Sequence, residues 1–175
     1  MGLFSKLFSK KEKKQKLPKK EQVHFDSVYC RFYYVNNPAT GEFGYEGEIE
    51  RNEDDIDELT VYLDTDSPET LEAGACYERL QDILSGREDI DSELKINIAD
   101  YFLSKPEFTN QEHTAQELAN KMFLIWLGIF RNGEIRLSFD TAGIYAEEIS
   151  VLQKADGTRE ITYTDYYHKT YCDKL

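Results

Sequence analysis

The stretch MFLIWLGIFRNGEIRLSFD, Met122 to Asp140, decides the expected fold because it has the pattern of two strands joined by a tight turn. Phe123 to Phe130 is apolar on both faces, which is typical of a central strand. RNGE follows at 131–134, and its Asn-Gly pair tolerates the positive φ angles of a type I′ hairpin turn. In EIRLSFD the chain then alternates apolar and polar residues. The segment therefore predicts a β-hairpin that contains a central strand.

Further strands are expected on both sides of this hairpin. Before it, aromatic and β-branched residues are frequent or alternate with polar ones in FDSVYCRFYYVNN (25–37), EFGYEGEIE (42–50) and LTVYLDT (59–65). After it, EISVLQK (148–154) and REITYTDYY (159–167) show the same pattern, with the turn residues ADGT between them. The chain therefore predicts one antiparallel meander on each side of its middle third.

Three helices are expected between the two groups of strands. The first begins at the capping residue Ser67 and ends before Gly86, the second runs from about 88 to 105, and the third from 111 to about 122. The order predicts an α+β protein: a β-meander, three helices and a second β-meander, which form an antiparallel sheet of six to seven strands with the helices on one face.

The charge of the chain is divided unevenly. Its first twenty residues carry eight lysines and one glutamate, whereas the whole chain of 175 residues has a net charge of −13. So acidic a main domain would repel a phosphate backbone, which argues against nucleic acid as its partner. It favours a cationic partner, or a surface that is acidic only for solubility. We therefore divide the chain into a basic amphipathic tail (1–22), an acidic α+β domain (23–167) and a C-terminal tail (168–175).

The basic tail has the pattern of a membrane-surface helix. Its leucines and phenylalanines share one side of a helix, and lysines flank them, as in segments that bind anionic lipid. The candidate membrane contacts are Leu3, Phe4, Lys6, Leu7, Phe8, Lys10 and Lys11. Two alternatives stay open: a disordered solubilising tail, and a tail that folds back onto the acidic surface.

Cysteine usage and hydropathy bear on location. Cys30, Cys76 and Cys172 are an odd number without close pairing, which favours a reduced cytoplasmic setting. The longest apolar stretch, 122–130, is much shorter than the roughly 20 residues of a membrane span. In the tail the apolar residues precede most of the lysines, unlike in a secretory signal. We expect a cytoplasmic protein, with the inner face of the membrane as the alternative place.

The sequence indicates no catalytic site, metal or cofactor. His168 and Cys172 have a spacing that suits one face of a helix, but two ligands do not make a zinc site, and the terminus is expected to fray. Cys76 lies in an apolar stripe typical of the core. Phosphate-binding glycine loops and hydrolase nucleophile motifs are missing from the sequence. We therefore expect a protein that is not an enzyme.

Two groups of residues are candidates for binding a partner. One is the acidic loop between the second and third strands, which offers carboxylates to a cationic protein. The other is a pair of tyrosines expected to be exposed near the C-terminus. The candidates are Asp54, Asp55, Asp57, Glu58, Tyr166 and Tyr167.

YEGEIERNEDDIDELTVYLDTD (45–66) and IFRNGEIRLSFDTAGIYAEEISVLQKADGTREI (129–161) resemble a bacterial family of domains of unknown function, over about 25–163. Some of its members occur in toxin–immunity gene neighbourhoods. The resemblance implies an immunity-type inhibitor, which on the charge argument would bind a basic protein such as a toxin through its acidic surface. The alternatives are a membrane-surface adaptor docked through residues 1–20, and an enzyme of unrecognised type.

Overall fold

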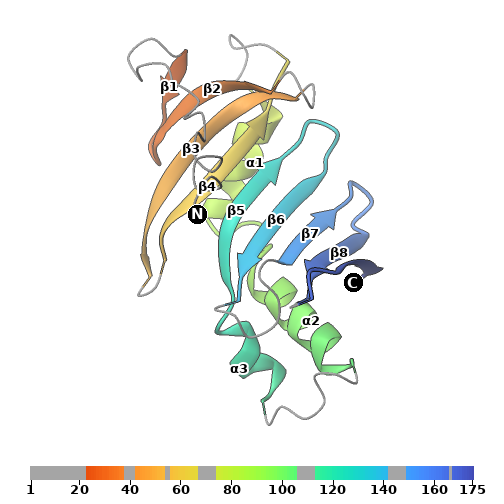
Figure 1. Ribbon diagram of the computed structural model, residues 1–175. Helices are drawn as coiled ribbons and strands as arrows, with labels where there is room; N and C mark the ends of the chain where they lie inside the picture. The colour runs from red at the N-terminus through yellow and green to blue at the C-terminus, as the bar shows by residue number, and fades with distance from the viewer. Residues whose placement is uncertain are drawn as a thin grey trace, which may run out of the picture.

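The computed structural model describes residues 23–37, 42–53, 56–66, 74–105, 113–141, 149–165 and 167–175. These residues form one nine-stranded sheet and three helices, and the strands follow one another across the sheet in chain order (Figure 1). The strands are β1 (His24–Asp26), β2 (Arg31–Asn37), β3 (Glu42–Glu53), β4 (Ile56–Asp64), β5 (Phe123–Ile129), β6 (Ile135–Asp140), β7 (Ile149–Gln153), β8 (Arg159–Thr164) and β9 (Thr170–Lys174). The helices are α1 (Ala75–Leu84), α2 (Ser92–Leu103) and α3 (Ala115–Ala119). The α+β class is confirmed, whereas six to seven strands are too few.

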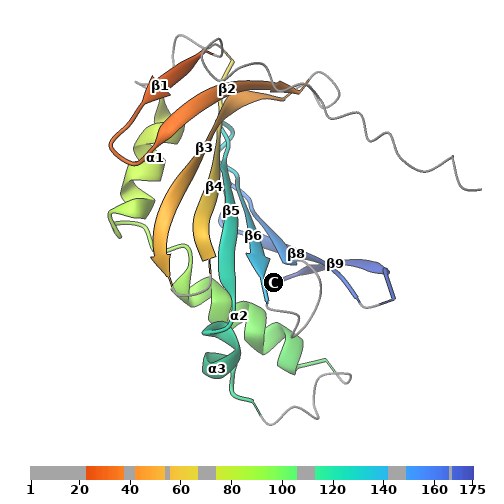
Figure 2. The same ribbon diagram turned by 60° about the vertical axis from the view of Figure 1, so that its left-hand side comes forward.

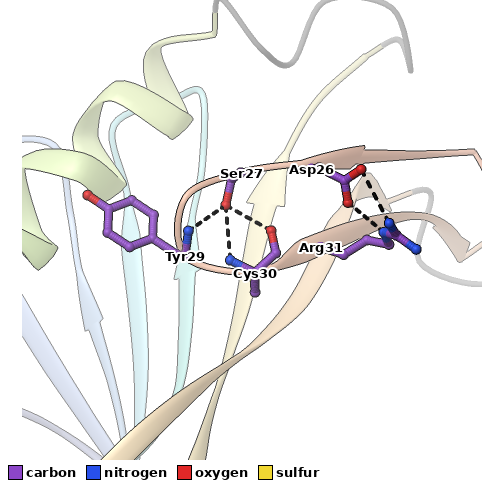
Figure 3. A network of polar contacts seen from close by, with 5 residues as sticks. All are labelled: Asp26, Ser27, Tyr29, Cys30 and Arg31. Carbon is purple, nitrogen blue, oxygen red and sulfur yellow. Dashed lines mark hydrogen bonds and ion pairs between the residues drawn. The ribbon is translucent and has the colours of Figure 1, made fainter.

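The first predicted strand is in fact the hairpin β1–β2. Ser27 Oγ accepts hydrogen bonds from the backbone N–H groups of Tyr29 and Cys30, both at 3.1 Å, and donates to the Cys30 carbonyl at 2.8 Å (Figure 3). Arg31 then pairs with Asp26 across the two strands. Because a single serine hydroxyl satisfies the turn, the composition of this segment does not reveal the interruption.

The C-terminal segment, which we expected to be a tail, contains the ninth strand. β9 pairs with β8, so the expectation of a frayed end at 170–174 is wrong. Asp173 of β9 accepts hydrogen bonds from Tyr101 and Lys105, at and just beyond the end of α2. The bonds from Tyr101 and then Lys105 lower the pKa of the Asp173 carboxyl. These contacts fix the terminal strand to a helix.

Three hairpins share one kind of turn. A type I′ turn between β5 and β6 needs two central residues with positive φ. Gly133 has φ of 86° but Asn132 is not among the positive-φ residues, so that prediction is wrong. The turn is a three-residue loop whose last residue is left-handed. Gly157 (φ 85°) is the left-handed last residue of the loop between β7 and β8, and His168 (φ 60°) is the corresponding residue between β8 and β9.

The sheet is antiparallel except at one place. β4 and β5 are parallel neighbours, with Thr60 opposite Trp126 and Leu63 opposite Ile129. Parallel strands require a long crossover, and here the crossover contains all three helices of the described chain. The expectation of a wholly antiparallel sheet is therefore wrong, whereas two groups of antiparallel strands flanking the helices are confirmed.

The helix boundaries follow local hydrogen bonding. Ser67, the predicted cap of the first helix, lies outside the described residues, and the predicted end before Gly86 is confirmed. α2 begins at Ser92, later than predicted, because the Asp89 carboxylate accepts bonds from two backbone N–H groups and forms a turn there. α3 begins after Thr114, whose side chain takes part in a capping box, and is shorter than predicted.

The hydrophobic core lies between the helices and one face of the sheet (Figure 2). Leu80 of α1 and Phe102 of α2 are fully buried, and the Phe102 ring lies 4.9 Å from the ring of Tyr163 on β8. A buried apolar side chain of this size contributes about 1.5–3 kcal/mol. The strand residues of this face that are most deeply buried are Phe32, Tyr45, Leu59, Val61, Leu63, Leu127, Ile129, Ile135, Leu137, Phe139, Ile149, Val151 and Ile161.

Candidate binding surface on the open face of the sheet

The second face of the sheet is covered by no described helix, and we call it the open face; Figure 1 looks onto it. Because side chains alternate along a strand, the open face carries the residues between the buried ones. Ser138 and Ser150 are linked there by a hydrogen bond of 3.2 Å between their hydroxyl groups. The cross-strand register places one continuous row on this face: Glu48, Thr60, Trp126, Ser138, Ser150, Thr162 and Cys172.

Two aromatic rings lie flat on this mostly polar face because glycines lie beneath them. The rings of Trp126 and Tyr62 are stacked, with centroids 6.3 Å apart and planes 17° apart. A Cβ atom at Gly128 would overlap the Trp126 ring. A Cβ atom at Gly44 would lie 2.5 Å from the Tyr62 ring and 2.6 Å from the backbone oxygen of Leu63. Glycine within a strand permits such close approach, and here it permits two large rings to lie against the sheet.

The rings border two hollows of the open face. One, of about 260 Å³, is lined by Tyr62, Trp126, Phe130 and Glu46, and by Val35, Asn36 and Arg136. The other, of about 910 Å³, extends from β4 to β8 and shares Trp126 and Arg136 with the first. The Arg136 guanidinium lies 4.4 Å from the centroid of the Phe130 ring. The only tryptophan of the chain therefore stands between two hollows on the uncovered side of the sheet.

An acidic stripe runs beside these hollows. It consists of Glu46, Glu48 and Glu50 on β3 with Glu58 on β4, and all four side chains are exposed. Glu50 and Glu58 are directly opposite each other in the antiparallel pair, so like charges face across the ladder. Among the described residues, none is within ion-pair distance of these four carboxylates. The stripe is thus free to pair with cations from elsewhere.

The structure describes the side chains of two of the six predicted partner-binding residues, and these two lie apart. Glu58 belongs to the acidic stripe, and Asp57 precedes it in β4 with a side chain outside the described part. Tyr167 is 90% exposed in the β8–β9 turn, four strands away from β4. Glu58 and Tyr167 therefore do not belong to one site. Asp54, Asp55 and Tyr166 lie outside the described residues, as does the tail 1–22 with its candidate membrane contacts.

The thiols of the first half of the chain are poor nucleophiles in this fold. Burial raises the pKa of the Cys30 thiol to about 11, and burial is also the main cause that raises the pKa of Cys76. His168 lies in a turn and Cys172 in β9, so the helical spacing that would bring them together does not exist. In the part of the chain that the structure describes, no three His, Cys, Asp or Glu side chains gather as metal ligands.

Comparison with protein-family models, curated proteins and solved structures finds no match to this chain. The resemblance to a family with toxin–immunity members therefore stays a prediction. No helix within the described ranges combines the length and the apolar character needed to cross a membrane.

The sequence analysis missed most of this surface, although two signals point to it. In EFGYEGEIE the alternation that buries Tyr45 and Ile49 also places the glutamates together on the other face. Isolated glycines within strands, at 44 and 128, indicate a close approach. That the approaching groups are aromatic rings follows only from the cross-strand register.

Proposed function

We propose that this protein is a non-catalytic binding protein whose acidic stripe, with Trp126 beside it, binds a cationic surface of another protein. The family resemblance makes an immunity-type inhibitor of a basic toxin the specific form of this proposal. The observation that supports it most is the stripe itself: four exposed carboxylates gathered on a sheet face that no described segment covers.

Opposite charges steer a basic partner toward the stripe, while buried aromatic anchors supply most of the affinity. Trp126 is suited to be an anchor because its ring is already fixed against Gly128 and stacked on the buried Tyr62 ring before a partner arrives. The facing pair Glu50 and Glu58 reduces the stability of the free protein, and a cationic partner would relieve that repulsion.

The test uses three full-length proteins as bait to capture basic proteins from the native lysate: the wild type, a stripe variant and a control variant. The stripe variant carries Glu46→Gln, Glu48→Gln and Glu50→Gln. The control variant carries Glu78→Gln and Glu93→Gln, which remove exposed acids from α1 and α2 on the other side of the sheet.

We expect a basic protein that the wild type and the control variant retain and the stripe variant loses. Its association rate should fall about tenfold in the stripe variant at low salt, since steering by opposite charges has effects of this size. Equal association rates of the stripe and control variants would refute the proposal. Replacing Trp126 by alanine should mainly accelerate dissociation, as is usual for an anchor.

A further inference from the structure

We propose that the open face is also the docking surface for this chain's own basic N-terminal segment, residues 1–20, which binds the acidic stripe and the adjoining aromatic hollow. This inference uses the surface assigned above to a partner, but it does not require that an external partner exists. The structure describes the chain from residue 23 onward, so the proposed docking segment, residues 1–20, lies outside the described part.

Charge is the first argument. The segment carries eight lysines and one glutamate. The stripe offers four exposed carboxylates that form no ion pair within the described part of the chain, with Arg136 as the cation that lines the hollows beside them. Each exposed pair changes an equilibrium constant by about 1.4- to 5-fold, so three or four pairs formed together have a measurable effect.

The point of attachment is the second argument. His24 is opposite Tyr33, and Tyr33 is opposite Glu46, so the three residues lie in one cross-strand row of the open face. The His24 and Tyr33 rings are 6.0 Å apart in this row. The segment therefore joins the fold on the row that contains the first glutamate of the stripe.

Distance does not limit docking. β1 and β3 are separated by two strand spacings, about 10 Å in all. Twenty residues can extend to about 66–72 Å at most. A tether of this length keeps the segment at an effective concentration of the order of millimolar around the stripe. Contacts too weak for a free peptide are therefore populated within one chain.

The apolar residues of the segment provide the third argument. Leu3, Phe4, Leu7 and Phe8 accompany the lysines, and the hollow beside Glu46 is bordered by Tyr62, Trp126 and Phe130. The segment thus combines cationic and aromatic groups, and the surface offers acidic and aromatic groups next to each other. An external basic partner would have to displace the segment, which makes the segment a competitive regulator of the proposed binding site.

The experiment measures the distance between the segment and Trp126 in the full chain. A nitroxide is attached at Ser9→Cys in a chain whose exposed native thiol is removed by Cys172→Ser. Because Trp126 is the only tryptophan, the ¹⁵N spectrum contains a single indole N–H signal, which the nitroxide broadens when it is near. The same labelled chain is prepared with the stripe variant and with the control variant defined above.

At low salt we expect strong broadening of the indole signal in the labelled chains that carry the wild-type surface or the control substitutions. The relaxation enhancement should fall at least about threefold in the stripe variant, in line with the loss of three exposed pairs. It should fall similarly between about 0.05 and 0.5 M salt, because the Debye length shrinks well below 10 Å. Equal broadening in the stripe and control variants would overturn the proposal, because it would show only random approach of a tethered segment.

Vesicles that contain anionic lipid supply the second measurement. If the segment docks on the stripe, the stripe variant should bind such vesicles at least about twofold more tightly than the control variant, since the stripe no longer competes with the lipid for the lysines. Equal vesicle binding by the two chains would contradict docking. A partner retained by the wild-type bait but lost by the stripe variant would still support the proposed function, so the two ideas can fail separately.

Discussion

The facing glutamates of the acidic stripe allow a test of the electrostatics of the open face. Glu50 and Glu58 are directly opposite each other in the β3–β4 ladder. Replacing either one by lysine turns a like-charge pair into an opposite-charge pair on exposed strand positions. We therefore expect Glu50→Lys and Glu58→Lys each to stabilise the fold, although each places a cation on the acidic stripe.

The magnitude follows from the geometry of the pair. Directly opposite residues have Cβ atoms about 4.5–5.5 Å apart. Two exposed charges about 6 Å apart interact by about 0.7 kcal/mol in water, and salt reduces this to about 0.3–0.5 kcal/mol. A single substitution reverses the sign of this interaction, so it should raise the free energy of unfolding by about 0.6–1 kcal/mol. In the chain with both substitutions two lysines face each other, and the repulsion returns.

The assay is a double-mutant cycle measured by urea unfolding, followed by the fluorescence of Trp126. The coupling energy contains the pair interaction four times, once for each protein of the cycle, so it should be about 1–2 kcal/mol at about 0.1 M salt. At about 0.5 M salt it should fall to less than half. If the changes in unfolding free energy of the two single substitutions add up to that of the double substitution within about 0.3 kcal/mol, the reasoning is refuted, because independent sites behave in that way.

Three further outcomes follow from single positions. Gly128→Ala should displace the Trp126 ring, shift its emission to longer wavelength and destabilise the fold by about 1–3 kcal/mol, measured by fluorescence and urea unfolding. His168→Gly should stabilise the fold by about 1 kcal/mol, because glycine adopts the positive φ of 60° without strain; an unchanged urea midpoint would contradict this. Timed alkylation at pH 8 with intact-mass detection should modify the exposed Cys172 well before Cys30, whose pKa is about 11; the reverse order would show that Cys30 is not held in the β1–β2 turn.

The fold was predictable where an element depends only on the residue pattern within its own segment. Alternation in 135–140 and 159–164 identified strands, and the apolar run at 123–129 identified a central one. The β1–β2 interruption was not predictable because it depends on hydrogen bonds of the Ser27 hydroxyl within a segment of strand-forming composition. The parallel pairing of β4 with β5 was also not predictable, since the side-chain pattern of a strand is the same whichever way its neighbour runs.

The candidate surface was predictable only in part. The acidic composition predicts a cationic partner, and Glu58 is among the predicted binding residues, but the sequence places them in the loop between β3 and β4 and not on the strand face. The apolar run around Trp126 was interpreted as buried on both sides. In the structure one side is open, and glycines rather than a covering layer support its rings. Which residues become neighbours on a sheet depends on register, and register is a property of pairs of strands.

The parallel seam between β4 and β5 also has a consequence for the time course of folding. Each other pair of neighbouring strands is antiparallel and joins segments that are close in sequence, so its closure has a small entropic cost. Thr60 can pair with Trp126 only after the intervening chain, which contains α1, α2 and α3, has become compact. Contacts of such long sequence separation slow folding, so the two meanders should nucleate independently and early. Pairing of β4 with β5 would then be the rate-limiting step, and the single tryptophan, Trp126, lies in this strand pair.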